Sequence, residues 1–144
     1  MLDFVNRRLG GISGIEKCSN LKQLFFRKNL ITKIENINNL VKLEHLELYD
    51  NKIAKIEGIS DLVELQILDL SFNNIRKIEG LESIGKVKKL YLLSNRIKKI
   101  ENLENKNELE ELELGSNKIR VIENLKDFPS MRVLVLAKNL IEEI

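Results

Sequence analysis

The chain of 144 residues contains only one cysteine and one histidine. A single cysteine cannot form an internal disulfide, which excludes the disulfide-dense scaffolds of small secreted proteins. His45 stands alone, and no Cys-x-x-Cys pair, glycine-rich phosphate loop or His-x-x-x-His pair accompanies it. Because a lone histidine at an outward strand position is more often an ordinary surface residue than a metal ligand, we expect a binding module that is not an enzyme and uses no cofactor.

Signals for export and for membrane insertion are also missing. Residues 1–8 lack the apolar core of a signal peptide, and no uninterrupted apolar stretch approaches the length of a membrane span. The 24 basic and 22 acidic residues leave a formal charge of +2, and the sequence shows no basic arm or stripe that could contact nucleic acid. We therefore expect an intracellular protein that binds no nucleic acid, no membrane and no small-molecule substrate.

A 22-residue repeat runs through most of the chain without an insertion. Each unit reads Leu-x-x-Leu-x-Leu-x-x-Asn-x-Ile-x-x-Ile, and this spacing is that of a leucine-rich repeat. Because such an array buries its core only by stacking neighbours, we predict one continuous solenoid over residues 1–144. Its units are a partial first repeat at 1–20, full repeats at 21–42, 43–64, 65–86, 87–108 and 109–130, and an incomplete last repeat at 131–144.

The spacing also predicts the path of each unit. Apolar residues two apart, such as Leu68 and Leu70, predict a short strand with one buried face. Asn73 follows this strand, where a compact amide can satisfy the backbone groups of an inward turn. The fold class is therefore α/β: a right-handed, curved leucine-rich-repeat solenoid with a parallel sheet of six strands on the concave face and short 3-10 turns on the convex face. The asparagines expected to stack as a buried ladder are Asn29, Asn51, Asn73, Asn95, Asn117 and Asn139.

The sixteenth position of each unit is either glycine or asparagine, which predicts a backbone φ above zero at that corner. A glutamate precedes the corner in five units, and we expect it to accept hydrogen bonds from free amides at the start of the convex turn. A solvated ladder of charges with little net energy is the alternative. The corner residues are Gly14, Asn36, Gly58, Gly80, Asn102 and Asn124, and the glutamates are Glu35, Glu57, Glu79, Glu101 and Glu123.

Two unusual residues occupy an apolar slot on the convex side of the repeat. Cys18 fills the slot in the first unit, where we expect a buried structural thiol. Lys106 fills it in the fourth full unit, so that one convex turn has no apolar side chain at this position. We expect the aliphatic stem of Lys106 to lie along the core while its ammonium group reaches water. Elsewhere the slot holds Leu40, Leu62, Ile84 and Phe128.

Strand residues between the buried leucines point outward onto the concave face, and stacking places equivalent residues in columns about 5 Å apart. Aromatic and acidic side chains alternate there, which is typical of a protein-binding surface, although single exposed aromatics also occur on ordinary surfaces. Because Phe25, Tyr49 and Tyr91 share one sheet face, we favour a binding surface. The central column is Asp3, Phe25, Glu47, Asp69, Tyr91, Glu113 and Val135, flanked by His45, Ile67, Lys89, Glu111 and Val133 on one side and by Arg27, Tyr49, Ser71, Leu93 and Gly115 on the other.

The Ile-Glu-Asn or Ile-Glu-Gly endings, as at 100–102 and 78–80, resemble a 22-residue subclass of these repeats. It is typified by the leucine-rich-repeat regulatory subunit of type 1 Ser/Thr protein phosphatase. The resemblance covers roughly residues 21–144 and implies that the chain binds and regulates the phosphatase catalytic subunit in the nucleus and cytoplasm. Segments that resemble consecutive repeats of that regulator, in the same order, are 46–51, 67–73, 112–117 and 120–124.

In that family, phosphatase contacts follow a concave column that reads Asp, aromatic, Glu, aromatic in successive repeats. This pattern lands on Asp69, Tyr91, Glu113 and Val135, of which Val135 departs from the aromatic. Family members carry more repeats and a C-terminal cap, so a fragment or a reduced member is expected here. The resemblance and the columns together predict the partner-binding residues Phe25, Glu47, Tyr49, Asp69, Tyr91, Leu93, Glu113 and Val135.

Other interpretations remain open from the residues alone. The same repeat subclass serves as a scaffold for ciliary dynein and spliceosomal proteins, so a different intracellular partner is the first alternative. A secreted adhesion or recognition receptor is disfavoured by the missing signal sequence and the absence of disulfide-bonded caps. An enzyme is the least favoured class because no catalytic residues converge.

Overall fold

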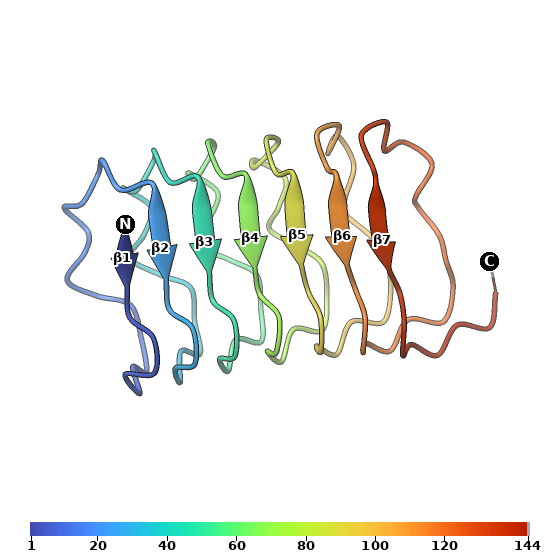
Figure 1. The fold of residues 1–144 in the computed structure, drawn as a ribbon, viewed down its shortest axis with the longest axis horizontal. Helices are drawn as coiled ribbons and strands as arrows, with labels where there is room; N and C mark the ends of the chain where they lie inside the picture. The colour runs from blue at the N-terminus through green and yellow to red at the C-terminus, as the bar shows by residue number, and fades with distance from the viewer. Residues whose placement is uncertain (144) are drawn as a thin grey trace.

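The computed structural model describes residues 1–143, so residue 144 of the predicted last repeat lies outside the described part. Seven short strands form a single parallel sheet in the order in which they occur along the chain (Figure 1). Among the described residues there is no helix that is long and apolar enough to cross a membrane. The strands are β1 (Leu2–Asp3), β2 (Gln23–Phe25), β3 (His45–Glu47), β4 (Ile67–Asp69), β5 (Lys89–Tyr91), β6 (Glu111–Glu113) and β7 (Val133–Val135).

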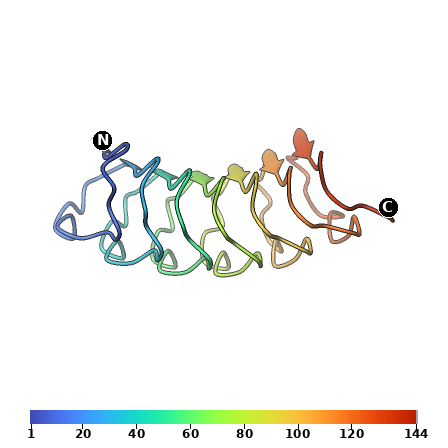
Figure 2. The same cartoon turned by 90° about the horizontal axis from the view of Figure 1, so that it is seen from below.

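Each strand pairs with the next in a register offset of one repeat. Leu46 lies opposite Leu68, and Glu47 lies opposite Asp69, as the unbroken spacing predicts. Seen from below, the strands follow the inner side of a gentle arc and the connecting turns follow its outer side (Figure 2). The predicted solenoid with a parallel sheet on its concave face is therefore confirmed.

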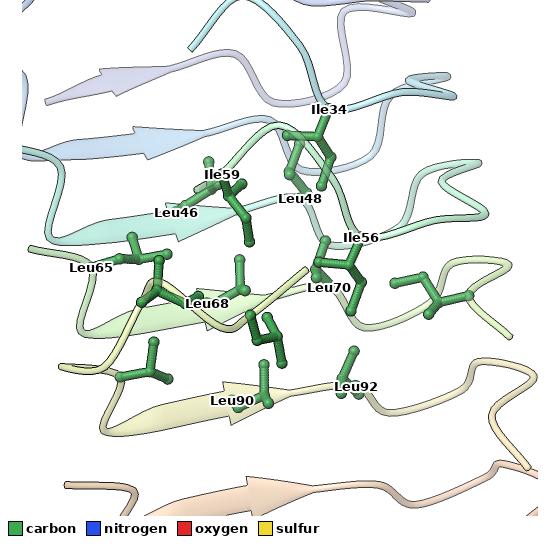
Figure 3. Packing of buried hydrophobic residues seen from close by; sticks show 14 of the residues in the cluster. Ile34, Leu46, Leu48, Ile56, Ile59, Leu65, Leu68, Leu70, Leu90 and Leu92 are labelled. Atoms are coloured by element: carbon green, nitrogen blue, oxygen red, sulfur yellow. The ribbon is translucent and has the colours of Figure 1, made fainter. Parts of the chain in front are cut away.

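The core is a stack of aliphatic side chains between the sheet and the convex turns. The central leucine of each interior strand is buried, and Leu46, Leu68 and Leu112 are 0% exposed. Figure 3 shows Leu46 and Leu68 packed near isoleucines of the opposite side, such as Ile56 and Ile59. Burying one such side chain contributes about 1.5–3 kcal/mol. Strands of three residues are too short to be stable alone, so this stacking between units holds the sheet together.

The asparagine ladder forms as predicted. The side-chain oxygen of Asn73 accepts the backbone N–H of Ile53 at 3.0 Å, and its amide nitrogen donates to the carbonyls of Leu48 and Leu70 at 2.9 and 3.0 Å. Asn73 is 7% exposed, so each of these bonds is made away from water. The same arrangement recurs at Asn51, Asn95 and Asn117 among others.

The predicted left-handed corners are present in all six units that carry one. Asn36 has a φ of 60°, and its side-chain amide donates to the carbonyl of Ile12 at 2.7 Å. At the equivalent Gly58, with a φ of 69°, a Cβ would lie 2.2 Å from the carbonyl oxygen of Ile34. Glycine therefore fits because it has no side chain, whereas asparagine fits because it hydrogen bonds to the same kind of carbonyl.

One detail of the predicted fold is wrong, and another holds only as isolated turns. The sheet has seven strands and not six, because the partial first unit contributes β1 through Leu2 and Asp3. No 3-10 helix occurs on the convex side of residues 1–143. Single turns follow one another there, as when Leu40 donates to Ile37 at 3.0 Å and Leu43 donates to Leu40 at 2.9 Å. A 3-10 helix needs such bonds at consecutive residues, whereas here they are three residues apart.

Two side-chain predictions also fail. Cys18 is exposed and not buried, because it lies in the first unit, where no preceding unit covers its turn. The glutamates before the corners accept no backbone N–H within residues 1–143. Glu35 instead lies 3.5 Å from Lys33, and Glu57 lies 3.8 Å from Lys55. These exposed ion pairs agree with the alternative of a solvated charge ladder.

Lys106 is buried more deeply than the sequence suggests. The residue is only 3% exposed, so its stem lies in the core as predicted but its ammonium group has little access to water. The pKa of Lys106 is lowered because burial disfavours the charged form, and the carboxylates of Glu82 and Glu104 partly oppose this shift. One convex turn therefore contains a poorly solvated cation.

Candidate functional site

The outward residues of the strands form the predicted columns on the concave face. Asp69, Tyr91 and Glu113 occupy the same register position on β4, β5 and β6. The column extends from Asp3 at one end to Val135 at the other. All of these positions remain accessible because they point away from the core.

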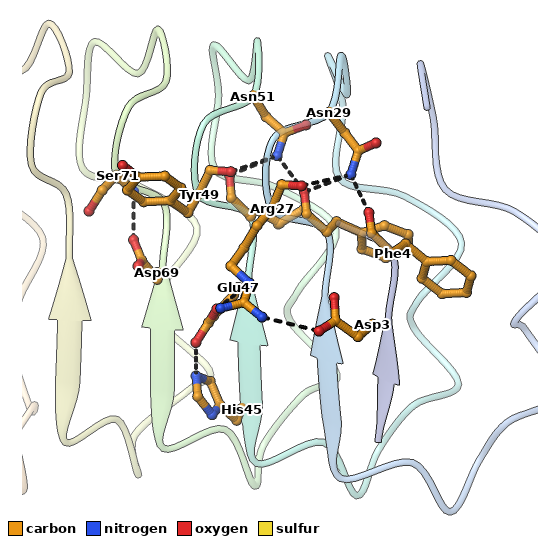
Figure 4. Close-up of polar contacts among 12 residues, drawn as sticks. Asp3, Phe4, Arg27, Asn29, His45, Glu47, Tyr49, Asn51, Asp69 and Ser71 are labelled. Carbon is orange, nitrogen blue, oxygen red and sulfur yellow. Dashed lines mark hydrogen bonds and ion pairs between the residues drawn. The ribbon is translucent and has the colours of Figure 1, made fainter. Parts of the chain in front are cut away.

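Arg27 joins the acidic residues at the N-terminal end of this face. Its guanidinium nitrogens lie 3.1 Å from Asp3 Oδ2 and 3.3 Å from Glu47 Oε2, and its Cζ lies 5.2 Å from the centre of the Phe25 ring. Figure 4 shows the guanidinium between the two carboxylates, which come from the two strands that flank β2: Asp3 from β1 and Glu47 from β3. Arg27 therefore compensates two acids and also stacks on an aromatic ring.

His45 extends the same network on β3. Its Nε2 lies 2.9 Å from Glu47 Oε1 (Figure 4). Its ring also meets the Phe25 ring edge-on, with ring centres 4.8 Å apart. Both oxygens of Glu47 are thus already engaged by cationic or polar neighbours. Within residues 1–143, no three His, Cys, Asp or Glu side chains are grouped so as to hold a metal ion.

A second network surrounds Tyr91 on β5. The Tyr91 hydroxyl donates to Glu111 Oε2 at 2.6 Å, and Lys89 Nζ donates to Glu111 Oε1 at 2.8 Å. The pKa of Glu111 is lowered by these two hydrogen bonds. The pKa of Tyr91 is raised, first by burial and then by its bond to Glu111, so the hydroxyl stays protonated at neutral pH. The tyrosine ring is thereby held across the sheet face.

Asp69 lies between the two networks and makes no ion pair within residues 1–143. Burial raises the pKa of its carboxyl group, while the bond that it accepts from the Ser71 N–H at 2.8 Å lowers it. Glu113, on the other side of Tyr91, also lacks an ion pair in the described chain. Tyr91 is therefore flanked by two carboxylates that make no ion pair within residues 1–143, although the charges of His45 and Arg27 act to lower the pKa of Asp69.

A shallow hollow lies beside this part of the column. It is lined by Arg27, Lys28, Glu47, Tyr49 and Asp69, together with Val5. Tyr49 packs against Phe72, with ring centres 5.1 Å apart.

Lys28 and Phe72 were not predicted for this face. Both precede a ladder asparagine and have a φ of 55°, which turns their side chains toward the sheet face. The only available signal was their recurrent place before that asparagine.

The eight residues predicted to bind a partner all lie on this face and are half-buried. The structure brings Glu47, Tyr49 and Asp69 together around the hollow, and places Tyr91 beside Asp69 and Glu113. Phe25 packs under Arg27, whereas Leu93 follows β5 and contacts Gly115. Val135 is farther along the column, on β7. Their role in binding stays a prediction.

A family model described as leucine-rich repeats in two copies matches residues 19–61, 41–83 and 63–105. The chain belongs to the leucine-rich-repeat family. No curated protein matches the chain. Membership therefore rests on the family model, which describes a repeat scaffold without indicating a particular partner.

Several solved structures share this architecture. A leucine-rich-repeat protein of Leptospira interrogans is 26% identical, with a TM-score of 0.81 over 87% of this chain and 33% of its own. Internalin C2 of Listeria monocytogenes is 26% identical, with a TM-score of 0.71 over 97% of this chain and 72% of its own. TLR13, solved in a complex with ssRNA13, is also 26% identical, with a TM-score of 0.75 over 87% of this chain and 19% of its own. The chain thus spans about a third of the Leptospira protein.

Proposed function

We propose that the chain is a non-enzymatic protein-binding scaffold whose concave face receives the partner. One observation carries this proposal: Tyr91 lies in the central column between two carboxylates that make no ion pair in the described chain. Half-buried aromatic side chains beside unpaired charges are typical of binding anchors. A partner that supplies basic groups would compensate Asp69 and Glu113 while covering the tyrosine ring.

The partner that we propose is the catalytic subunit of type 1 Ser/Thr protein phosphatase. The support comes from the resemblance, in which Asp, aromatic and Glu occupy successive repeats, and from the adjacency of Asp69, Tyr91 and Glu113. Val135 would contribute an apolar contact where the family has an aromatic ring. By this proposal the chain modulates the phosphatase in the nucleus and cytoplasm, without chemistry of its own.

The proposal is tested by biolayer interferometry, with the whole chain immobilised and the purified type 1 catalytic subunit in solution. We expect saturable binding that weakens as salt rises, because carboxylates form part of the contact. An unrelated phosphatase of similar size serves as the control and should not bind. Absence of binding to the type 1 subunit, or equal binding to both enzymes, would contradict this choice of partner.

A further inference from the structure

Basic side chains lie close together along one flank of the solenoid, although they are not consecutive in the sequence. After each ladder asparagine, three outward positions lead from the asparagine turn toward the convex side. In the five units from Leu30 to Val121 these positions contain lysine and arginine but no aspartate or glutamate. All of the basic side chains are exposed. This basic flank consists of Lys33, Lys52, Lys55, Arg76, Lys77, Arg96, Lys98, Lys99, Lys118 and Arg120.

The repeat brings these residues together although they are far apart in sequence. The Arg96 N–H donates to the carbonyl of Ile75 at 2.8 Å, which places Arg96 beside Arg76 of the preceding unit. The Lys118 N–H makes the same bond to Ile97, which places Lys118 beside Lys98. These segments follow the strands at their carboxyl ends, along the edge that faces the viewer in Figure 2. A hollow there is lined only by Arg76, Arg96, Lys98 and Lys118.

Few of these charges are compensated within the described chain. Lys33 and Lys55 lie 3.5 and 3.8 Å from the neighbouring Glu35 and Glu57, and Arg120 pairs with Glu142. The other seven basic side chains make no ion pair or side-chain hydrogen bond with residues 1–143. They are Lys52, Arg76, Lys77, Arg96, Lys98, Lys99 and Lys118.

Because the potentials of these uncompensated positive charges add up, the surface attracts anions strongly. Arginine and lysine are also the side chains that bind phosphate oxygens best, arginine through two parallel N–H bonds. We propose that the basic flank binds the sugar-phosphate backbone of a nucleic-acid duplex, on a surface separate from the concave face. The expectation that the chain lacks a basic stripe is therefore wrong: its members are spread over units 22 residues apart and meet only in the folded solenoid.

Charge density favours a duplex over a protein segment. The seven uncompensated side chains belong to four successive units, which span about 14 Å at roughly 4.8 Å per unit. Over that length a DNA duplex carries about eight phosphates on its two strands, of which about four face one side, whereas an extended peptide has about four residues, of which about two face the flank. A phosphorylated peptide would thus leave most of the flank unused.

The shape and composition of the flank also favour a duplex over a single-stranded nucleic acid and over a lipid bilayer. The flank contains no aromatic side chain, and proteins that hold single strands stack bases on aromatic rings. Contacts through the backbone alone suit a duplex, whose bases are already stacked. A planar bilayer would touch the tips of the side chains and leave the hollow between Arg76 and Lys118 unfilled, whereas the ridge of a duplex backbone can enter it.

The test is fluorescence anisotropy with the whole chain and a labelled 20-base-pair DNA duplex of arbitrary sequence. If about four phosphates are contacted, the slope of log K against log salt should be about −4. Replacing Arg76, Arg96, Lys98 and Lys118 together by glutamine should lower the affinity at least 100-fold in 50 mM salt and bring the slope to about −2. The double variant Arg96→Gln/Lys98→Gln should fall between these values.

The matched control removes four exposed lysines from other parts of the solenoid and should keep the affinity within threefold. Its substitutions are K22Q, K42Q, K86Q and K126Q. A thermal melt verifies that each variant is folded, and Tyr91→Ala should bind the duplex like the parent chain.

Four results would overturn the proposal. The first is absence of duplex binding by the parent in 50 mM salt, and the second is an equal loss of affinity in the two quadruple variants. The third is loss of duplex binding in Tyr91→Ala. The fourth is tighter binding of the parent to the single strand, to a phosphoserine peptide or to phosphatidylserine vesicles than to the duplex.

Discussion

The side-chain oxygen of Asn73 accepts the backbone N–H of Ile53, a residue of the preceding unit, at 3.0 Å. The amide nitrogen of the same side chain donates to Leu48 of that unit and to Leu70 of its own. One asparagine therefore connects two units at the point where the chain turns inward. Since the bonds are buried, no water can replace them when the side chain is removed.

We expect Asn73→Ala to lower the free energy of unfolding by about 1–3 kcal/mol, because buried backbone groups lose their partners. The change should be measured by chemical denaturation. Asn74→Ala is the matched control: it follows Asn73 directly, its side chain makes no hydrogen bond within residues 1–143, and it should change little. Equal stabilities of the Asn73 variant and the parent would contradict the ladder.

At the Gly58 corner, substitution by alanine should lower the stability more than substitution by asparagine. Gly58→Ala requires a left-handed backbone and puts a Cβ against the Ile34 carbonyl, at a cost of at least about 1–2 kcal/mol. Gly58→Asn should cost less, because the amide can donate to that carbonyl as Asn36 does to Ile12. Denaturation curves of the two variants provide the comparison. If asparagine were as harmful as alanine, this explanation of the corner would be wrong.

Lys106→Leu should stabilise the solenoid by up to about 1–2 kcal/mol, because an apolar side chain replaces a poorly solvated cation. The lowered pKa of Lys106 means that the folded state releases its proton more readily than the unfolded state. The free energy of unfolding of the parent therefore increases as pH rises through the lowered pKa toward the ordinary value of 10.5. The difference in stability between the leucine variant and the parent should become smaller over that interval. Thermal melts at pH 7 and at alkaline pH test both statements. An unchanged or lower midpoint in the variant at pH 7 would contradict them.

Asp69→Asn should remove the cost of a half-buried carboxylate while keeping an oxygen that can accept the Ser71 N–H. The raised pKa of Asp69 means that the folded state binds this proton more readily than the unfolded state. Relative to the asparagine variant, the parent should therefore gain stability as pH falls from 7 through the raised pKa toward 3.8. Denaturation at several pH values measures this difference. A parent that loses stability relative to the variant over that interval would show the opposite sign.

The spacing of the repeat predicts the register, the buried leucines, the asparagine ladder and the left-handed corners, because each depends on one residue type at a constant interval. The hydrogen bonds of the convex turns are set by local backbone geometry, which apolar spacing does not specify, so the spacing does not tell whether the expected 3-10 turns are isolated or join into a helix. Cys18 was misjudged because an equivalent position is buried only where a neighbouring unit covers it.

Contacts between particular side chains are harder to predict from the sequence. The columns were predicted, but the contacts of Arg27 with Asp3 and Glu47 depend on how a long side chain bends across three strands. The basic flank was missed altogether. The charges look mixed along the chain, whereas the fold gathers residues such as Arg76 and Lys98 on one surface.

The central claim is that the concave column around Tyr91 binds the protein partner, and titration of variants against the type 1 phosphatase catalytic subunit tests it most directly. Tyr91→Ala and Glu113→Lys should each weaken binding by about 2 kcal/mol or more, roughly 30-fold, because buried anchors dominate such interfaces. The controls Val63→Ala and Glu108→Lys change an exposed apolar and an exposed acidic residue away from the column and should bind like the parent. Parent-like affinity in both column variants, alongside measurable binding by the parent, would contradict the claim.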